Sequence, residues 1–266
     1  MSRTRGTWNT KGTWIAGGVL AAVLALTGYA VLGGGDGGSN EAGKGGGASP
    51  SASSSAGAAP TYAAPDDWTE PERWVALPRG KRTDKGGRPV GFPHTTEGAV
   101  ALLAAANTTA TEGSRTLADE QLANYRAYVA KADQKPQNAE NIELAANDAD
   151  KEAHIRMGLP AGSDLPSGAY TRNSVIGYRV IEASDDEVSV WLLAKVTMKA
   201  GETAKESASY TRTLMAGTWE DDDWKMSSAA LIRASQQTEG KPKPQMAVPG
   251  DAKFNSYGWT AIREAS

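Results

Sequence analysis

The stretch Val188–Met198 reads VSVWLLAKVTM and predicts a strong β-strand. Val175–Ala183, VIGYRVIEA, alternates before it, and Ser207–Trp219, SASYTRTLMAGTW, follows it as another long strand. Trp224–Leu231 is expected to pair back as the last strand. Short polar turns separate these segments at 184–187, 201–202 and 220–223. The pattern predicts a four-stranded antiparallel meander.

Three helical patterns precede the predicted sheet. The first begins near Thr95 or Thr96, either of which can cap a helix. The second follows Thr116, with Asp119 three residues later as a capping-box partner. The third runs over Ala139–Met157, and Gly158 is expected to end it. Helices followed by a meander predict an α+β cone of about three helices on four strands.

The N-terminal residues 14–32 read WIAGGVLAAVLALTGYAVL and carry no charge. A helix of this length spans about 28 Å, close to the hydrocarbon thickness of a bilayer. The segment therefore predicts a transmembrane anchor in the lipid bilayer. Its expected anchoring residues are the large apolar and aromatic side chains Trp14, Ile15, Val19, Leu20, Val23, Leu24, Leu26, Tyr29 and Leu32.

The charges that flank this segment predict its orientation. Arg3, Arg5 and Lys11 precede the apolar run, and the positive-inside rule keeps such residues in the cytoplasm. The expected location is thus the cytoplasmic membrane, with a single pass, the N-terminus inside and the C-terminal domain outside. The alternative is a signal peptide that is cleaved after Ala30.

Composition divides the remaining chain into segments. Residues 1–13 would be cytoplasmic and 14–32 transmembrane, and the Gly/Ser/Ala/Pro-rich 33–65 would be a disordered linker. Residues 66–93 are expected to be an irregular arm, 94–235 the α+β domain and 236–266 a C-terminal tail. The aromatic and apolar residues of this tail would either fold back on the domain or bind a partner; they are Phe254, Tyr257, Trp259 and Ile262.

Composition also excludes several functions. The chain has no cysteine, so disulfides, thiol catalysis and zinc–thiolate sites are absent. The net charge is −3 and no basic stripe is visible, which argues against nucleic acid as a partner. The abundance of alanine and glycine suits an actinobacterial source.

Two stretches resemble a known fold family. Gly91–Val100 is a Pro-Thr-rich entry into a helix of small residues, and 219–226 reads WEDDDWKM between two strands. The WEDDDWKM stretch is similar to the W-x-D-G-D-W ending of nuclear-transport-factor-2-like domains, although Asp222 stands where the turn glycine usually stands. With the anchor and linker, the chain resembles actinobacterial scaffold subunits of conjugative type IV secretion (TcpC-like and VirB-type) and membrane proteins associated with Mce lipid importers. That resemblance implies a non-catalytic protein–protein module.

The sequence offers few groups for catalysis or metal binding. His94 is expected to hydrogen-bond a loop before a helix, and His154 to lie on the surface near a helix end. The acidic runs 185–187 and 221–223 are expected to be solvated turns, since neither has the alternating spacing of a calcium loop. We therefore expect no catalytic residue, no metal and no cofactor.

Aromatic residues of the predicted meander are the remaining candidates for a partner surface or ligand pocket. These are Tyr178, Trp191, Tyr210, Trp219 and Trp224. Core packing is the competing explanation. The sequence-based hypothesis is a non-catalytic, membrane-anchored extracytoplasmic interaction or assembly module, with membrane-protein partners or a homo-oligomer. The alternative is a small-molecule-binding or catalytic cone domain exported to the cell surface.

Overall fold

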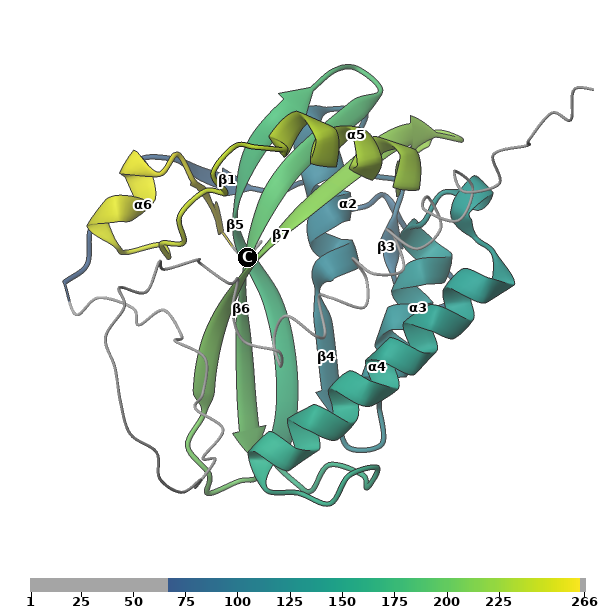
Figure 1. Cartoon of the computed structure of the whole chain (residues 1–266), viewed down its shortest axis with the longest axis vertical. Helices are drawn as coiled ribbons and strands as arrows, with labels where there is room; N and C mark the ends of the chain where they lie inside the picture. The colour runs from purple at the N-terminus through teal and green to yellow at the C-terminus, as the bar shows by residue number, and fades with distance from the viewer. Residues whose placement is uncertain (1–66, 264–266) are drawn as a thin grey trace, which may run out of the picture.

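The computed structural model describes residues 67–263, which fold into a mixed α/β structure with one large sheet and five α-helices (Figure 1). The strands of the large sheet are β1 (Trp74–Ala76), β4 (Thr109–Glu112), β5 (Ala169–Ala183), β6 (Glu187–Ala200), β7 (Ser207–Glu220), β8 (Asp223–Met226) and β9 (Thr260–Arg263). The helices are α2 (Thr96–Asn107), α3 (Leu117–Tyr128), α4 (Pro136–Met157), α5 (Ser228–Thr238) and α6 (Ala252–Ser256). A 3-10 turn, η1, covers Lys131–Asp133, while β2 (Arg82–Thr83) and β3 (Pro89–Val90) form a separate pair.

The order in the large sheet is β1-β9-β5-β6-β7-β8, and β4 also pairs with β5. The strands β5 to β8 form the expected antiparallel meander. The predicted four-stranded sheet is nevertheless wrong, because the sheet has seven strands and its β1–β9 pair is parallel. The three missed strands are short and pair with segments far away in sequence, so their local pattern is weak.

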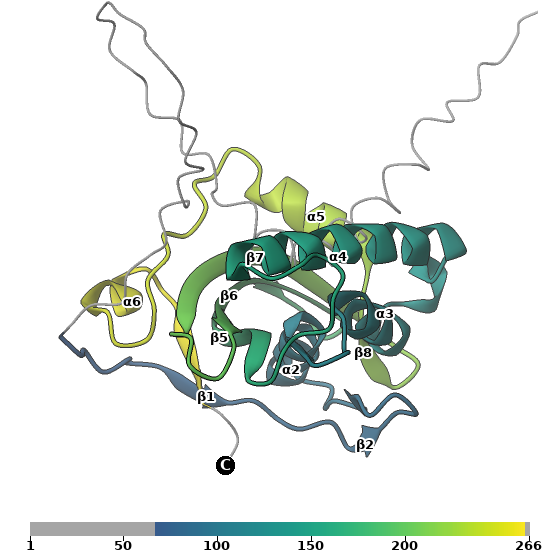
Figure 2. The same ribbon diagram turned by 90° about the horizontal axis from the view of Figure 1, so that it is seen from below.

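Burial on both faces of β6 explains why the sheet needs cover on both sides. Its alternate residues Val188, Val190 and Leu192 share a core cluster with α2. Trp191 and Leu193 face a separate cluster. The C-terminal segment supplies Phe254, Trp259 and Ala261 to that separate cluster, so the tail folds back on the domain. Figure 2 shows the sheet curling around α2, with α5 on its other side.

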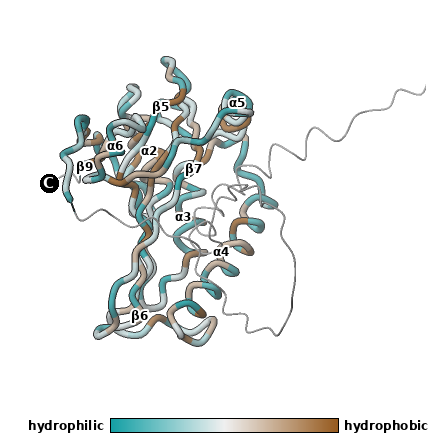
Figure 3. Tube along the Cα trace, turned by 60° about the vertical axis from the view of Figure 1, so that its left-hand side comes forward, coloured by the Kyte–Doolittle hydropathy of each residue, from teal (hydrophilic) through white to brown (hydrophobic). Residues whose placement is uncertain are grey.

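The three expected helices are present. Thr95 caps α2 by accepting from the Gly98 amide. Thr116 and Asp119 form the predicted capping box of α3. The Asp119 carboxylate accepts a hydrogen bond from the Thr116 amide, and this bond lowers the pKa of Asp119. α4 begins three residues earlier than predicted, at Pro136, and ends at Gly158 in the left-handed conformation. Hydrophobic and hydrophilic segments recur in turn along α4 (Figure 3), as expected of a helix that buries one face.

The prediction of a strand over Trp224–Leu231 is wrong in its second half. Extended pairing stops at Met226, and Ser227 then caps α5 through the amide of Ala230. Ala230, Leu231 and Ala234 form the buried stripe of this helix. A serine cap before residues spaced three and four apart favours a helix, whereas the apolar content alone had suggested a strand.

The predicted transmembrane helix is also corrected. Within residues 67–263, no helix combines the length and apolar character needed to cross a membrane. The single-pass, signal-anchor description is therefore not retained. The predicted α+β fold class is likewise corrected, because the described chain is mixed α/β, with one large sheet and five α-helices. The segments 1–13, 14–32 and 33–65, with the proposed cut after Ala30, lie outside the described residues.

The geometry of the β7–β8 hairpin explains why Asp222 can stand where the related motif has a glycine. Glu220 pairs with Asp223, so the loop contains only Asp221 and Asp222. Their φ angles are 52° and 59°, which is the type I′ geometry that favours glycine, asparagine and aspartate.

Replacing Asp222 with glycine is expected to stabilise the protein by about 0.5–1 kcal/mol, because glycine adopts positive φ without the steric cost of a β-carbon. Urea denaturation of the full-length chain would measure the change. Asp222→Ala is the matched control and should destabilise, since alanine keeps the β-carbon but lacks the local hydrogen bonding of aspartate. A glycine variant less stable than the parent would contradict this assignment of the turn.

Candidate functional site

The five aromatic candidates do not form one pocket. Tyr178, Trp191 and Trp224 are buried, whereas Tyr210 and Trp219 are half-buried. Tyr178 and Trp224 belong to the α2 cluster, and Trp191 lies in the cluster under the C-terminal segment. Burial raises the pKa of both Tyr178 and Tyr210. These residues mainly fill the two cores and do not line a shared ligand surface.

Trp219 and Trp224 pack against each other and against His94. The indole of Trp224 donates to the Pro93 carbonyl over 2.9 Å, and the two indoles meet edge to face at 5.5 Å. The His94 ring stacks on Trp219 at 3.9 Å, and its Nε2 lies 2.7 Å from the Asp185 carbonyl oxygen. His94 therefore joins the loop before α2 to the β5–β6 turn, whereas the sequence had suggested a hydrogen bond to its own loop.

His154 is buried, contrary to the expectation of a surface position. Its Nδ1 lies 2.7 Å from the Asp150 carbonyl oxygen, and its Nε2 lies 2.9 Å from that of Ser163. The ring thus fastens the loop after α4 to the helix. The adjacent cavity has about 30 Å³, which is the size of one water molecule.

Asp150, from the same cavity, links α4 to α3. Its carboxylate accepts from the Leu117 amide over 2.7 Å, at the N-terminus of α3. Burial raises the pKa of Asp150, and the hydrogen bond from Leu117 only partly opposes that shift. In the described part of the chain, no group of three or more acidic or histidine side chains is placed to hold a metal ion.

The raised pKa of Asp150 predicts a pH-dependent loss of stability. The folded state holds this proton more tightly than the unfolded chain, so the favourable contribution is complete below the ordinary pKa of 3.8. It disappears as the pH rises through the folded pKa. Asp150→Asn keeps an oxygen acceptor for Leu117 and should remove this slope.

Unfolding of the parent and of Asp150→Asn should be compared from pH 3.5 to about pH 8. The parent is expected to lose stability relative to the variant as the pH rises. Asp148→Asn, at an exposed position of the same helix, is the control. Parallel stability curves for the parent and Asp150→Asn would contradict the burial effect.

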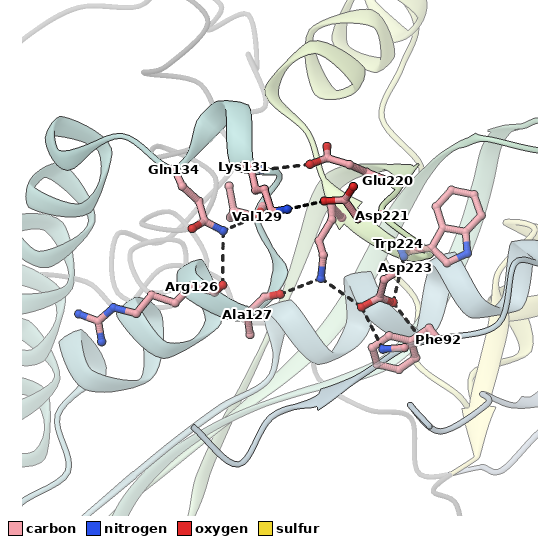
Figure 4. Close-up of polar contacts among 12 residues, drawn as sticks. Phe92, Arg126, Ala127, Val129, Lys131, Gln134, Glu220, Asp221, Asp223 and Trp224 are labelled. Atoms are coloured by element: carbon pink, nitrogen blue, oxygen red, sulfur yellow. Dashed lines mark hydrogen bonds and ion pairs between the residues drawn. The ribbon is translucent and has the colours of Figure 1, made fainter. Parts of the chain in front are cut away.

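The acidic turn 221–223 is not uniformly solvated. The Asp221 carboxylate is exposed and lies 2.6 Å from Lys131 Nζ, which lowers the pKa of Asp221 and raises that of Lys131. The backbone amide of Lys131 also donates to Glu220 (Figure 4). Asp223, in contrast, is buried and bonded to the chain around Phe92. The turn therefore joins η1 to the arm that precedes α2.

A larger concave feature lies beside the C-terminal segment. It is an open groove of about 710 Å³. Its lining includes Tyr178–Val180 of β5 and Arg73, which precedes β1. The C-terminal segment supplies the remaining lining residues, which are Pro242–Gln245, Ser256–Gly258 and Thr260. This groove therefore joins four parts of the chain that are distant in sequence.

Positive charge distinguishes this groove. Arg73, Arg179 and Lys243 line it and are exposed, and none of the described lining residues is acidic. Arg179 Nη1 donates to the Tyr257 carbonyl over 3.2 Å, and Arg73 Nη2 donates to that of Trp259 over 3.3 Å. Each bond uses one of several guanidinium N–H groups, so both arginines retain donors for an anion.

Sequence reasoning missed this groove. Arg73 lies in the predicted arm, Arg179 interrupts an alternating strand, and Lys243 belongs to the Lys-Pro-Lys-Pro connector. No local motif unites them, because β9 and the C-terminal segment bring them together only in the folded chain. The positive charge of Arg179 within the strand pattern VIGYRVIEA was the one available signal.

Comparison of the chain with protein-family models, with curated proteins and with solved structures found no match.

Proposed function

We propose that this chain is a non-catalytic interaction module that binds an anionic partner protein in the groove beside its C-terminal segment. The observation that carries this proposal is the collection of Arg73, Arg179 and Lys243 around one open groove. The chain as a whole has a net charge of −3, so the positive groove is a local feature. Complementary charge both attracts a partner and selects among partners.

Packing inside the curled sheet supports a binding role on the outside. Leu103, Tyr128, Met215 and Trp224 are almost fully buried in the α2 cluster. Side chains therefore occupy the concave side, where a cone domain would hold a small ligand. The interaction role agrees with the one implied by the resemblance to conjugative scaffold subunits.

The proposal can be tested with a fluorescent peptide rich in Asp and Glu and the full-length chain. Fluorescence anisotropy should show binding that weakens with added salt, whereas a lysine-rich peptide of the same length should not bind. Arg179→Glu should weaken binding of the acidic peptide by at least about tenfold, equivalent to about 1.4 kcal/mol.

Two controls separate the groove from general charge effects. Arg126→Glu makes the same reversal at an exposed position on α3 and should leave binding unchanged. Arg179→Lys retains the charge and should retain most of the affinity. Equal weakening by Arg126→Glu and Arg179→Glu would refute the groove, as would equal binding of the acidic and basic peptides.

A further inference from the structure

The pairing of β5 leaves part of one edge open. On one side β5 pairs with β6 from Ala169 to Ala183, with register shifts between Val175 and Gly177 and between Val180 and Glu182. On the other side, β4 pairs with residues 170–173 and β9 pairs only with Gly177 and Tyr178. From Arg179 to Ala183, β5 has no strand partner on this side within the described residues.

The chain geometry keeps this edge open. β9 begins only at Thr260, two residues after Gly258, which has a φ of 76° and follows the short helix α6. Figure 1 shows α6 set to one side of the β5 ribbon. Because the chain turns at Gly258, the residues before β9 do not continue the pairing with β5 beyond Tyr178.

The groove runs along that open edge. Tyr178, Arg179 and Val180 are consecutive, and all three line it. Successive side chains of a strand point to opposite faces of the sheet, so a groove that touches three in a row lies against the edge of the strand. An open edge presents backbone N–H and C=O groups that can pair with another strand.

The charges around this edge indicate the occupant. Arg73, Arg179 and Lys243 approach from three separate segments. The nearby acid Glu182 is already engaged by the side chain of Gln237 on α5. Val180, 39% exposed, adds an apolar contact. An extended segment with acidic side chains matches this combination, since its backbone would pair with β5 while its carboxylates meet the cations.

We propose that an extended acidic segment of a partner protein binds by adding a strand to β5 along Arg179–Ala183. This inference rests on the proposed function, because it specifies how the same groove recognises its anionic partner. Main-chain hydrogen bonds supply a share of the affinity, and the three cations select acidic sequences.

Backbone methylation of the acidic peptide separates strand addition from simple charge attraction. The acidic peptide for this test alternates acidic and neutral residues, so only one of its edges can face β5 while the carboxylates meet the cations. N-methylation of alternate residues therefore blocks pairing in one of the two methylation patterns only. We expect one alternately methylated peptide to lose at least about tenfold in affinity for the full-length chain and the opposite register to keep it. Hydrogen exchange should also slow at backbone amides within residues 179–183 when the unmodified peptide binds.

The outcomes distinguish the two proposals. If both methylated peptides bind as well as the unmodified one, or if both weaken equally, strand addition is refuted while charge recognition by the groove stands. If the unmodified acidic peptide does not bind, or binds Arg179→Glu equally well, the proposed function itself fails. Protection confined to amides outside residues 179–183 would likewise overturn the assignment of this edge.

Discussion

Replacing Glu120 with alanine is expected to lower the free energy of unfolding by about 3–5 kcal/mol. The Glu120 side chain is 3% exposed, and its Oε1 lies 3.0 Å from Arg88 and 3.3 Å from Arg115. Its other oxygen accepts from the Ala110 amide over 3.3 Å. Removing this carboxylate leaves the half-buried Arg88 guanidinium without its paired anion, and a desolvated unpaired charge is costly.

Chemical denaturation of the full-length chain would measure this loss. Arg115→Ala is the matched control, because Arg115 is 63% exposed and should contribute no more than about 1 kcal/mol. The double variant Arg88→Met with Glu120→Leu should recover much of the stability, since apolar groups replace both charges. A loss below about 1 kcal/mol for Glu120→Ala would show that this ion pair does not hold the arm to α3.

Replacing Asp223 with alanine is expected to have a similar effect for a different reason. The buried carboxylate accepts from the amides of Gly91 and Phe92 at 2.9 Å and from that of Trp224 at 3.0 Å. Lys225 Nζ lies 3.1 Å from the same group. Alanine would leave several donors unsatisfied, at about 1–3 kcal/mol for each buried one. We expect a total loss of at least about 3 kcal/mol and release of the arm before α2.

Denaturation should be combined with hydrogen exchange at Gly91 and Phe92 for this variant. These two amides should exchange faster under native conditions than in the parent. Asp221→Asn is the control, because it removes an exposed ion pair while asparagine still tolerates positive φ. Unchanged exchange at Gly91 and Phe92 in Asp223→Ala would show that the carboxylate does not anchor the arm.

Local sequence patterns were sufficient to predict the helices α2 to α4 and the long strands β5 to β7. Thr95, Thr116 and Gly158 mark the ends of helices, because each acts through backbone groups within a few residues. The alternation and turns of residues 175–219 likewise identified the long strands, since neighbouring strands joined by short turns pair with each other. The sequence also excluded thiol chemistry, because the chain contains no cysteine.

Long-range pairing determined the rest. β1 and β9 are only three and four residues long, and no local signal says that they meet side by side next to Gly177. The burial of Asp223 and His154 depends on segments that pack over them, so their sequence neighbourhood suggested exposed positions instead. The basic groove exists because the C-terminal segment returns to β5, which places Arg73, Arg179 and Lys243 around one opening. Local chemistry thus determined where helices and strands form, while the tertiary structure alone decided which charges became neighbours.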